Sequence, residues 1–309
     1  MDQELTSRTD QDQKFKNILS KFKASVESML GSPKELKEAA DEGSTEAMMA
    51  YSYILYKGRG VTIDKNEAFK YAKMAADSGE VRCITNYCAM LQENLDEGDN
   101  LQVLTRYSKL AADKDDIVAL KHYAYFLYTG QGTPVDKLES LKYYQIIADK
   151  GDALAARNCL IIIDEEKLID RKARQYLRYA KMGSDLGDPE CQYRRGAIYA
   201  DGDLVEQDLP KAAELFQLSA EKGFLDAKYK YGLFLYEGYG IEENQEKSLQ
   251  WIKKASDEGH HRASIKYANI ILYEKNEEEK DKIEFALNLL KEEADQGFTE
   301  AMIIYHDYI

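Results

Sequence analysis

The sequence predicts an all-α fold, a solenoid of about seven helix-turn-helix repeats of 36 residues each. Glycines recur every 36 residues, and 38 residues apart in the last interval, with Asp115 in the one position of the series that lacks a glycine. A small residue, Ala or Cys, follows four residues after each of these positions. The recurring glycines are Gly43, Gly79, Gly151, Gly187, Gly223, Gly259 and Gly297.

Each repeat is expected to contain two helices joined by a turn. The small residue opens the first helix, in which apolar side chains return at helical spacing over about a dozen residues. A Gly-x-Gly turn follows in the first, third and sixth repeats, as in Gly238-Tyr239-Gly240. The second helix, such as KAAELFQLSAEKG, ends at the next recurring glycine, which we expect in a left-handed conformation. The repeats begin near residues 43, 79, 115, 151, 187, 223 and 259.

Both ends of the chain differ from the repeats. The first residues are polar and acidic, which is typical of a disordered tail. Seven apolar residues between Phe15 and Leu30 then fall on one helical stripe, and Ser32-Pro33-Lys34-Glu35 is typical of a helix start with a capping box. The expected organisation is a disordered acidic tail at 1–12, amphipathic capping helices at 13–42, the repeat array at 43–297 and a C-terminal capping helix at 298–309.

The sixth repeat carries a recognisable motif. AxxxYGxxLYxGxGI at residues 227–241, followed by KSLQWIKKASDEG up to Gly259, resembles the Sel1-like repeat, a relative of the tetratricopeptide repeat. The resemblance covers residues 43–309, although the second, fourth and seventh repeats lack the Gly-x-Gly turn. It implies a right-handed superhelix whose first helices line a concave groove. It also implies an adaptor or scaffold that binds a partner protein or peptide along that groove.

The composition limits the partners. With 42 basic and 56 acidic residues, the formal net charge of −14 disfavours binding to nucleic acid or to anionic membranes. No apolar stretch reaches the roughly 20 residues of a membrane helix, and the first residues lack the apolar core of a secretory signal. The four cysteines are few and irregularly spaced, as expected of reduced thiols. We therefore expect a cytoplasmic protein without membrane insertion, monomeric when free.

No constellation of residues predicts catalysis. Ser20-Lys21-Phe22-Lys23 fits the short motif of some serine acyl-transfer enzymes, but its companion motifs are absent. His260-His261 has no metal-ligand spacing, so a solvated or capping pair is favoured over a metal site. We predict no enzyme, cofactor or metal. The alternatives are a permanent structural subunit of a large assembly, for example a cytoskeletal one, and a β-lactamase-like hydrolase, which would suit secreted repeats with regularly paired cysteines.

The candidate binding surface lies on the first helices. If the small residue is position 1, then positions 1, 5 and 9 share the core face, and positions 3, 4, 7 and 11 point away from it, into the expected groove. Position 4 becomes basic toward the C-terminus, at Arg194, Lys230 and Lys266, beside aromatic and apolar residues of the kind found in binding hot spots. The alternative is that exposed basic residues align by accident. The predicted partner-binding residues are Tyr53, His122, Tyr125, Tyr193, Arg194, Tyr229, Lys230, Leu233 and Lys266, and the partner would be an acidic or apolar peptide or helix.

Overall fold

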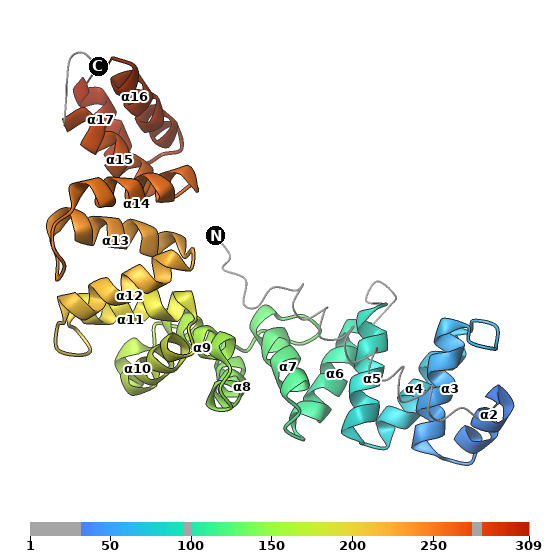
Figure 1. The fold of residues 1–309 in the computed structure, drawn as a ribbon. Helices are drawn as coiled ribbons and strands as arrows, with labels where there is room; N and C mark the ends of the chain where they lie inside the picture. The colour runs from blue at the N-terminus through green and yellow to red at the C-terminus, as the bar shows by residue number, and fades with distance from the viewer. Residues whose placement is uncertain (1–31, 95–99, 274–279, 309) are drawn as a thin grey trace. The chain divides into compact units, whose positions relative to one another are not determined.

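The computed structural model describes residues 32–94, 100–273 and 280–308, which form 16 α-helices packed in chain order (Figure 1). The expected tail and the apolar stripe of residues 13–31 lie outside the described residues. The first helices of the repeats are α3 (Thr45–Lys57), α5 (Val81–Gln92), α7 (Ile117–Thr129), α9 (Ala153–Glu165), α11 (Pro189–Asp201), α13 (Leu225–Glu237), α15 (His261–Tyr273) and α17 (Thr299–Tyr308). The second helices are α2 (Pro33–Asp41), α4 (Lys65–Asp77), α6 (Asn100–Ala112), α8 (Lys137–Asp149), α10 (Ile169–Asp185), α12 (Leu209–Glu221), α14 (Gln245–Asp257) and α16 (Lys280–Asp295).

The chain divides between Lys167 and Leu168 into two compact units. Unit 1 contains α2 to α9, and unit 2 contains α10 to α17. Inside each unit every helix packs against the next one along the chain, and α3 also contacts α5, the first helix of the following repeat. This packing confirms the predicted all-α solenoid of helix-turn-helix repeats.

A left-handed residue separates each second helix from the following first helix. All seven recurring glycines have positive φ, and Asp115, which replaces the glycine, has a φ of 67°. Aspartate tolerates this conformation better than most residues do, and its carboxylate also pairs with Lys150. The prediction that this position ends a helix is therefore confirmed even where glycine is missing.

The Gly-x-Gly turns end the first helices and bring two repeats close together. Gly58, Gly130 and Gly238 cap their helices in the left-handed conformation, and Gly202 does the same in the fifth repeat. The second glycine of the turn lies against the repeat before it: a Cβ atom on Gly240 would lie 2.2 Å from the carbonyl carbon of Leu209. A side chain at this position would therefore push two backbones apart.

Most helix starts are capped by side chains. The capping box predicted at Ser32 is present, because the Ser32 hydroxyl accepts from the N–H of Glu35 while the Glu35 carboxylate accepts from the N–H of Ser32. Aspartates at other starts accept from the N–H three residues further on, and each such cap stabilises its helix by about 1 kcal/mol. These aspartates are Asp64, Asp116, Asp136, Asp152, Asp188 and Asp208.

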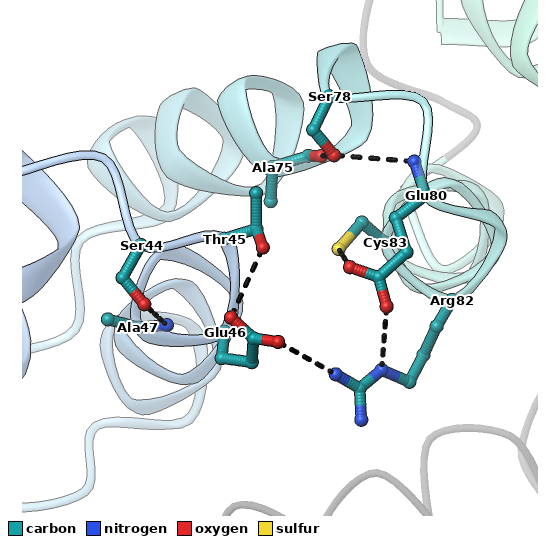
Figure 2. Close-up of polar contacts among 9 residues, drawn as sticks. All are labelled: Ser44, Thr45, Glu46, Ala47, Ala75, Ser78, Glu80, Arg82 and Cys83. Atoms are coloured by element: carbon teal, nitrogen blue, oxygen red, sulfur yellow. Dashed lines mark hydrogen bonds and ion pairs between the residues drawn. The ribbon is translucent and has the colours of Figure 1, made fainter.

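Small residues and polar contacts join neighbouring repeats. The position 1 residues, from Ala47 to Ala301, are all buried, so adjacent helices approach closely. The Tyr71 hydroxyl donates to Asp41 at 2.5 Å, and Tyr107 makes the same contact with Asp77 one repeat later. Figure 2 shows a further link: Arg82 Nη2 lies 3.8 Å from Glu46 in the preceding repeat. Its Nε also lies 3.6 Å from Glu80.

The Gly-x-Gly contact gives a stability prediction. We expect Gly240→Ala to lower the free energy of unfolding by at least about 2 kcal/mol more than Gly223→Ala, measured by urea denaturation. Both positions have positive φ, but a Cβ on Gly223 would meet nothing within 4 Å. Equal losses in the two variants would contradict the close approach of the repeats at Gly240.

Candidate protein-binding surface

In unit 2, one side of the first helices stays open. Six of the predicted residues lie there on α11, α13 and α15, and each is half-buried or exposed. Arg262, one residue before position 1 of α15, is exposed and lies close enough to Tyr193 and Tyr229 to influence both phenols electrostatically. We call this set the open face of unit 2: Tyr193, Arg194, Tyr229, Lys230, Leu233, Arg262 and Lys266.

The cations of the open face differ in how they are engaged. Lys230 and Arg262 are exposed and make no hydrogen bond or ion pair within the described part of the chain. The Lys266 ammonium lies over the ring of Tyr236, 4.4 Å from its centroid. An anionic group of a partner can therefore reach two unpaired charges and one that is held on an aromatic face.

Arg194 is engaged inside the unit. Its Nη2 and Nε donate to Glu190 at 2.7 and 2.9 Å, and its Nη1 donates to the Tyr176 hydroxyl at 3.4 Å. The Glu190 side chain is only 8% exposed, so the arginine neutralises a buried carboxylate. The predicted column of three equivalent basic residues therefore consists of one structural arginine and two more accessible lysines.

Aromatic rings form the floor of the open face. The ring of Tyr193 packs between Phe216 and Phe224, with centroids 5.6 and 5.2 Å away, and burial raises the pKa of this tyrosine. Tyr229 packs on the His260 ring at 4.7 Å. These rings are held by their own neighbours, so they offer a rigid apolar surface that costs little conformational entropy when a partner binds.

His260 links two helices at this surface. Its Nδ1 accepts from the N–H of Ala263, so Nε2 carries the proton that it donates to Asp226 at 3.2 Å. The hydrogen bond from His260 holds the pKa of Asp226 below its usual value. The histidine therefore caps the start of α15, as predicted. His261 makes its own contact, with Nδ1 2.8 Å from Glu293.

Sequence reasoning missed Arg262 and Asp226, and it did not place His260 at this surface. Arg262 and Asp226 both occupy the position before the small residue, which at 100° per residue lies between positions 4 and 7 on the helix. This position therefore faces the same side of the helix as positions 3, 4 and 7. His260 lies outside the helical part of the repeat, so no periodicity pointed to it.

In unit 1 the same side of the helices is not open, and this corrects the predicted continuous stripe. Tyr53 is 6% exposed and His122 is 3% exposed, while Tyr125 is half-buried. The guanidinium of Arg59 lies over the Tyr53 ring, and the His122 ring stacks on Phe126. Tyr53 and His122 therefore lie buried instead of lining an open groove.

The described residues offer little reactive chemistry. Among them, no group of three or more His, Cys, Asp or Glu side chains could hold a metal ion, and no helix is long and apolar enough to cross a membrane. The four cysteines are free and buried, and burial raises the pKa of Cys83 and of Cys88 to about 12. Ser20 and Lys23 of the short acyl-transfer motif lie outside the described residues.

Comparisons with known proteins agree with this architecture. The family model of the Sel1 repeat matches residues 45–80, 117–152, 189–224 and 225–260, and no catalytic family is identified. No curated protein matches the sequence.

Two solved structures share the fold. A protective antigen of uropathogenic Escherichia coli with an SLR fold aligns with a TM-score of 0.70 and 22% identity, over 88% of this chain and 58% of the antigen. A Sel1 repeat protein from Oxalobacter formigenes aligns with a TM-score of 0.50 and 24% identity, over 74% of this chain and 66% of its own. The chain thus spans less than two thirds of either relative.

The structural role of Arg194 can be tested by truncation. We expect Arg194→Ala to lower the free energy of unfolding by about 3 kcal/mol, because it removes the cation that donates two hydrogen bonds to the buried Glu190 carboxylate. Lys230→Ala, which removes an exposed cation, should change it by less than about 0.5 kcal/mol. Chemical denaturation measures the free energy of unfolding of both variants and of the double variant Arg194→Ala, Glu190→Gln. The double variant should be more stable than Arg194→Ala alone, because it no longer buries a charged carboxylate. A double variant no more stable than Arg194→Ala alone would argue against this role.

The pair of Asp226 and His260 predicts a pH dependence. Because the pKa of Asp226 is lowered in the folded chain, its ionised form stabilises the fold above its ordinary pKa, and this contribution is lost as pH falls through the lower folded value. Asp226→Asn should therefore be less stable than the parent at pH 6, with a difference that shrinks as pH falls below about 4. Thermal melts across this range measure the difference. A difference that stays constant with pH would rule out this pair as its source.

Proposed function

Because the chain belongs to the Sel1 repeat family, whose repeats typically mediate protein interactions, we propose that it is a non-enzymatic scaffold that binds a partner protein through the open face of unit 2. The observation that carries this proposal is that Lys230 and Arg262 are exposed without an ion pair among the described residues, with Arg262 close to the phenol of Tyr229. Burying these cations against a neutral surface would cost desolvation energy, so the partner segment is acidic.

The net charge of the chain supports a selective contact. A chain of net charge −14 repels acidic partners in general, and the open face gathers basic side chains on that background. An acidic segment would be attracted to Lys230, Arg262 and Lys266 on the first helices α13 and α15. Leu233 and the ring of Tyr229 add apolar contact area for a hydrophobic side chain of the partner, either in an extended peptide or on a helix.

We also propose that the protein is cytoplasmic, and that it is monomeric when no partner is bound. Buried, unpaired cysteines suit a reducing compartment. The alternative is a permanent structural subunit, which the exposed apolar side chains at the last helices favour: Phe285 on α16 and Ile303 on α17 are 49% and 58% exposed. Light scattering of the purified chain separates the two, because a scaffold stays monomeric and a structural subunit assembles.

Charge reversal tests the proposed surface. Peptides selected from a random display library on the intact chain should be enriched in Asp and Glu around one apolar residue. The combination Lys230→Glu, Arg262→Glu and Lys266→Glu should weaken their binding at least about tenfold at 150 mM salt, measured by fluorescence anisotropy. Arg194 is left unchanged because its loss would destabilise the fold.

A matched control carries the same change in charge elsewhere in unit 2. Lys247, Lys280 and Lys291 are exposed on the second helices α14 and α16. The combination Lys247→Glu, Lys280→Glu and Lys291→Glu should change the affinity by less than about threefold, since screening weakens charge effects beyond roughly 8 Å. Equal losses in both triple variants, or selected peptides without acidic residues, would refute the open face as the binding surface.

A further inference from the structure

The same helix positions differ in exposure between the two units. At positions 3 and 7, Met49, Tyr53, Ala89 and Ile161 of unit 1 are buried and its other four residues are half-buried, whereas Tyr229 and Leu233 of unit 2 are only half-buried. Ile265 is the exception in unit 2, since it packs in the cluster formed by α15, α16 and α17. Helices packed in the same repeat should expose the same positions equally. Part of this face of unit 1 is therefore more buried than the corresponding part of unit 2.

Two buried amides on this face have no hydrogen-bond partner in the part of the chain that the structure describes. Asn86 and Asn158 occupy position 4 of α5 and α9, are at most 2% exposed, and leave both Nδ2 and Oδ1 unsatisfied. A buried amide without partners costs about 1–3 kcal/mol, so a structure retains such groups where another segment supplies polar atoms. The face thus combines apolar side chains with two amides that need polar neighbours. We call this set the covered face of unit 1: Met49, Ala50, Tyr53, Asn86, Ala89, His122, Asn158 and Ile161.

We propose that the covered face of unit 1 is the docking site for residues 13–31 of this same chain. The segment carries a stripe of seven apolar residues that needs a partner surface. Ser25 lies at the edge of that stripe in the helical projection, so its hydroxyl can reach a buried amide of the face. A single segment therefore supplies both kinds of group that the face requires.

The length of residues 13–31 and their attachment to α2 fit docking on the covered face. As a helix, residues 14–30 would extend for about 26 Å. Directly packed helices lie about 8–10 Å apart, so such a helix is long enough to cross α3 and α5, which contact each other, and to reach beyond them. The segment ends next to Ser32, the cap of α2, and α2 packs on α3. The connection therefore delivers the segment at one edge of the covered face, at the high effective concentration of a short tether.

Charge favours the same arrangement. Residues 13–31 contain four lysines and one glutamate, whereas residues 32–167 contain 23 acidic and 17 basic side chains. In the helical projection the lysines flank the apolar stripe, where they can reach the edges of the face. This inference concerns unit 1 and does not rest on the function proposed for the open face of unit 2.

Photo-crosslinking of the full chain tests the docking. A benzophenone amino acid in place of Phe22, at the centre of the apolar stripe, should crosslink to first-helix residues of α5 and α7 within the same molecule. In place of Ala24, on the opposite side of the same helix, it should not. Mass spectrometry identifies the linked peptides. Links between two molecules would assign the face to a second copy, and links from both positions alike, to other surfaces or to none, would overturn the proposal.

Accessibility provides a second measurement on the intact chain. Ala89 is fully buried on the covered face, and the variant Ala89→Cys places a thiol there. The rate at which a maleimide labels this thiol is compared with the rate for the four buried native thiols. Phe22→Asp should accelerate labelling at least about tenfold, because it opens a face that is otherwise covered for most of the time. Ala24→Asp, the matched control, should leave the rate unchanged. Equal rates in the parent and in Phe22→Asp would show that residues 13–31 do not cover this face.

Discussion

A backbone residue in the left-handed conformation between successive repeats is the constraint on which the other features depend. It ends the second helix and reverses the chain within one or two residues, so the next first helix starts at a fixed point of the repeat. The small residue four positions later then always meets the preceding helices at the same place. Asp115 shows that the backbone conformation is what matters at this position, since it replaces glycine and keeps the positive φ. Because the turn fixes where each first helix begins, it also determines which side chains face the neighbouring repeats.

The two units share this repeat geometry but place different side chains on the outer side of their first helices. In unit 2, the first helices expose Lys230 and Arg262, neither of which forms an ion pair with a described residue, and Arg262 lies close to the phenol of Tyr229. In unit 1, the corresponding side carries Ala50, Asn86 and Asn158, all buried. The core positions hardly change between the units, because they must fit the repeat before and after. Positions outside the core are free of that requirement, so they are where one solenoid acquires different surfaces along its length.

The sequence predicted the features that follow from local rules and missed those that depend on packing between helices. The helices, the left-handed residue at Asp115 and the capping box at Ser32 follow from local rules, and the structure confirms them. The pairing of Arg194 with Glu190 could not be deduced, because the burial of that carboxylate depends on the packing around α11. The burial of Tyr53 and His122 was unpredictable for the same kind of reason. Helical periodicity indicates which side of a helix faces away from its own repeat, but it contains no information about what else covers that side.

The contacts between repeats also bear on how the chain acquires its structure during synthesis. The hydrogen bonds from Tyr71 to Asp41 and from Tyr107 to Asp77 each join residues 30 positions apart, and helices pack against their neighbours along the chain. A ribosome adds the 36 residues of one repeat in about 2–7 s, whereas helices form in about a microsecond. Each repeat can therefore pack on its completed predecessor before the next one emerges, so the nascent chain exposes about one repeat of apolar surface at a time.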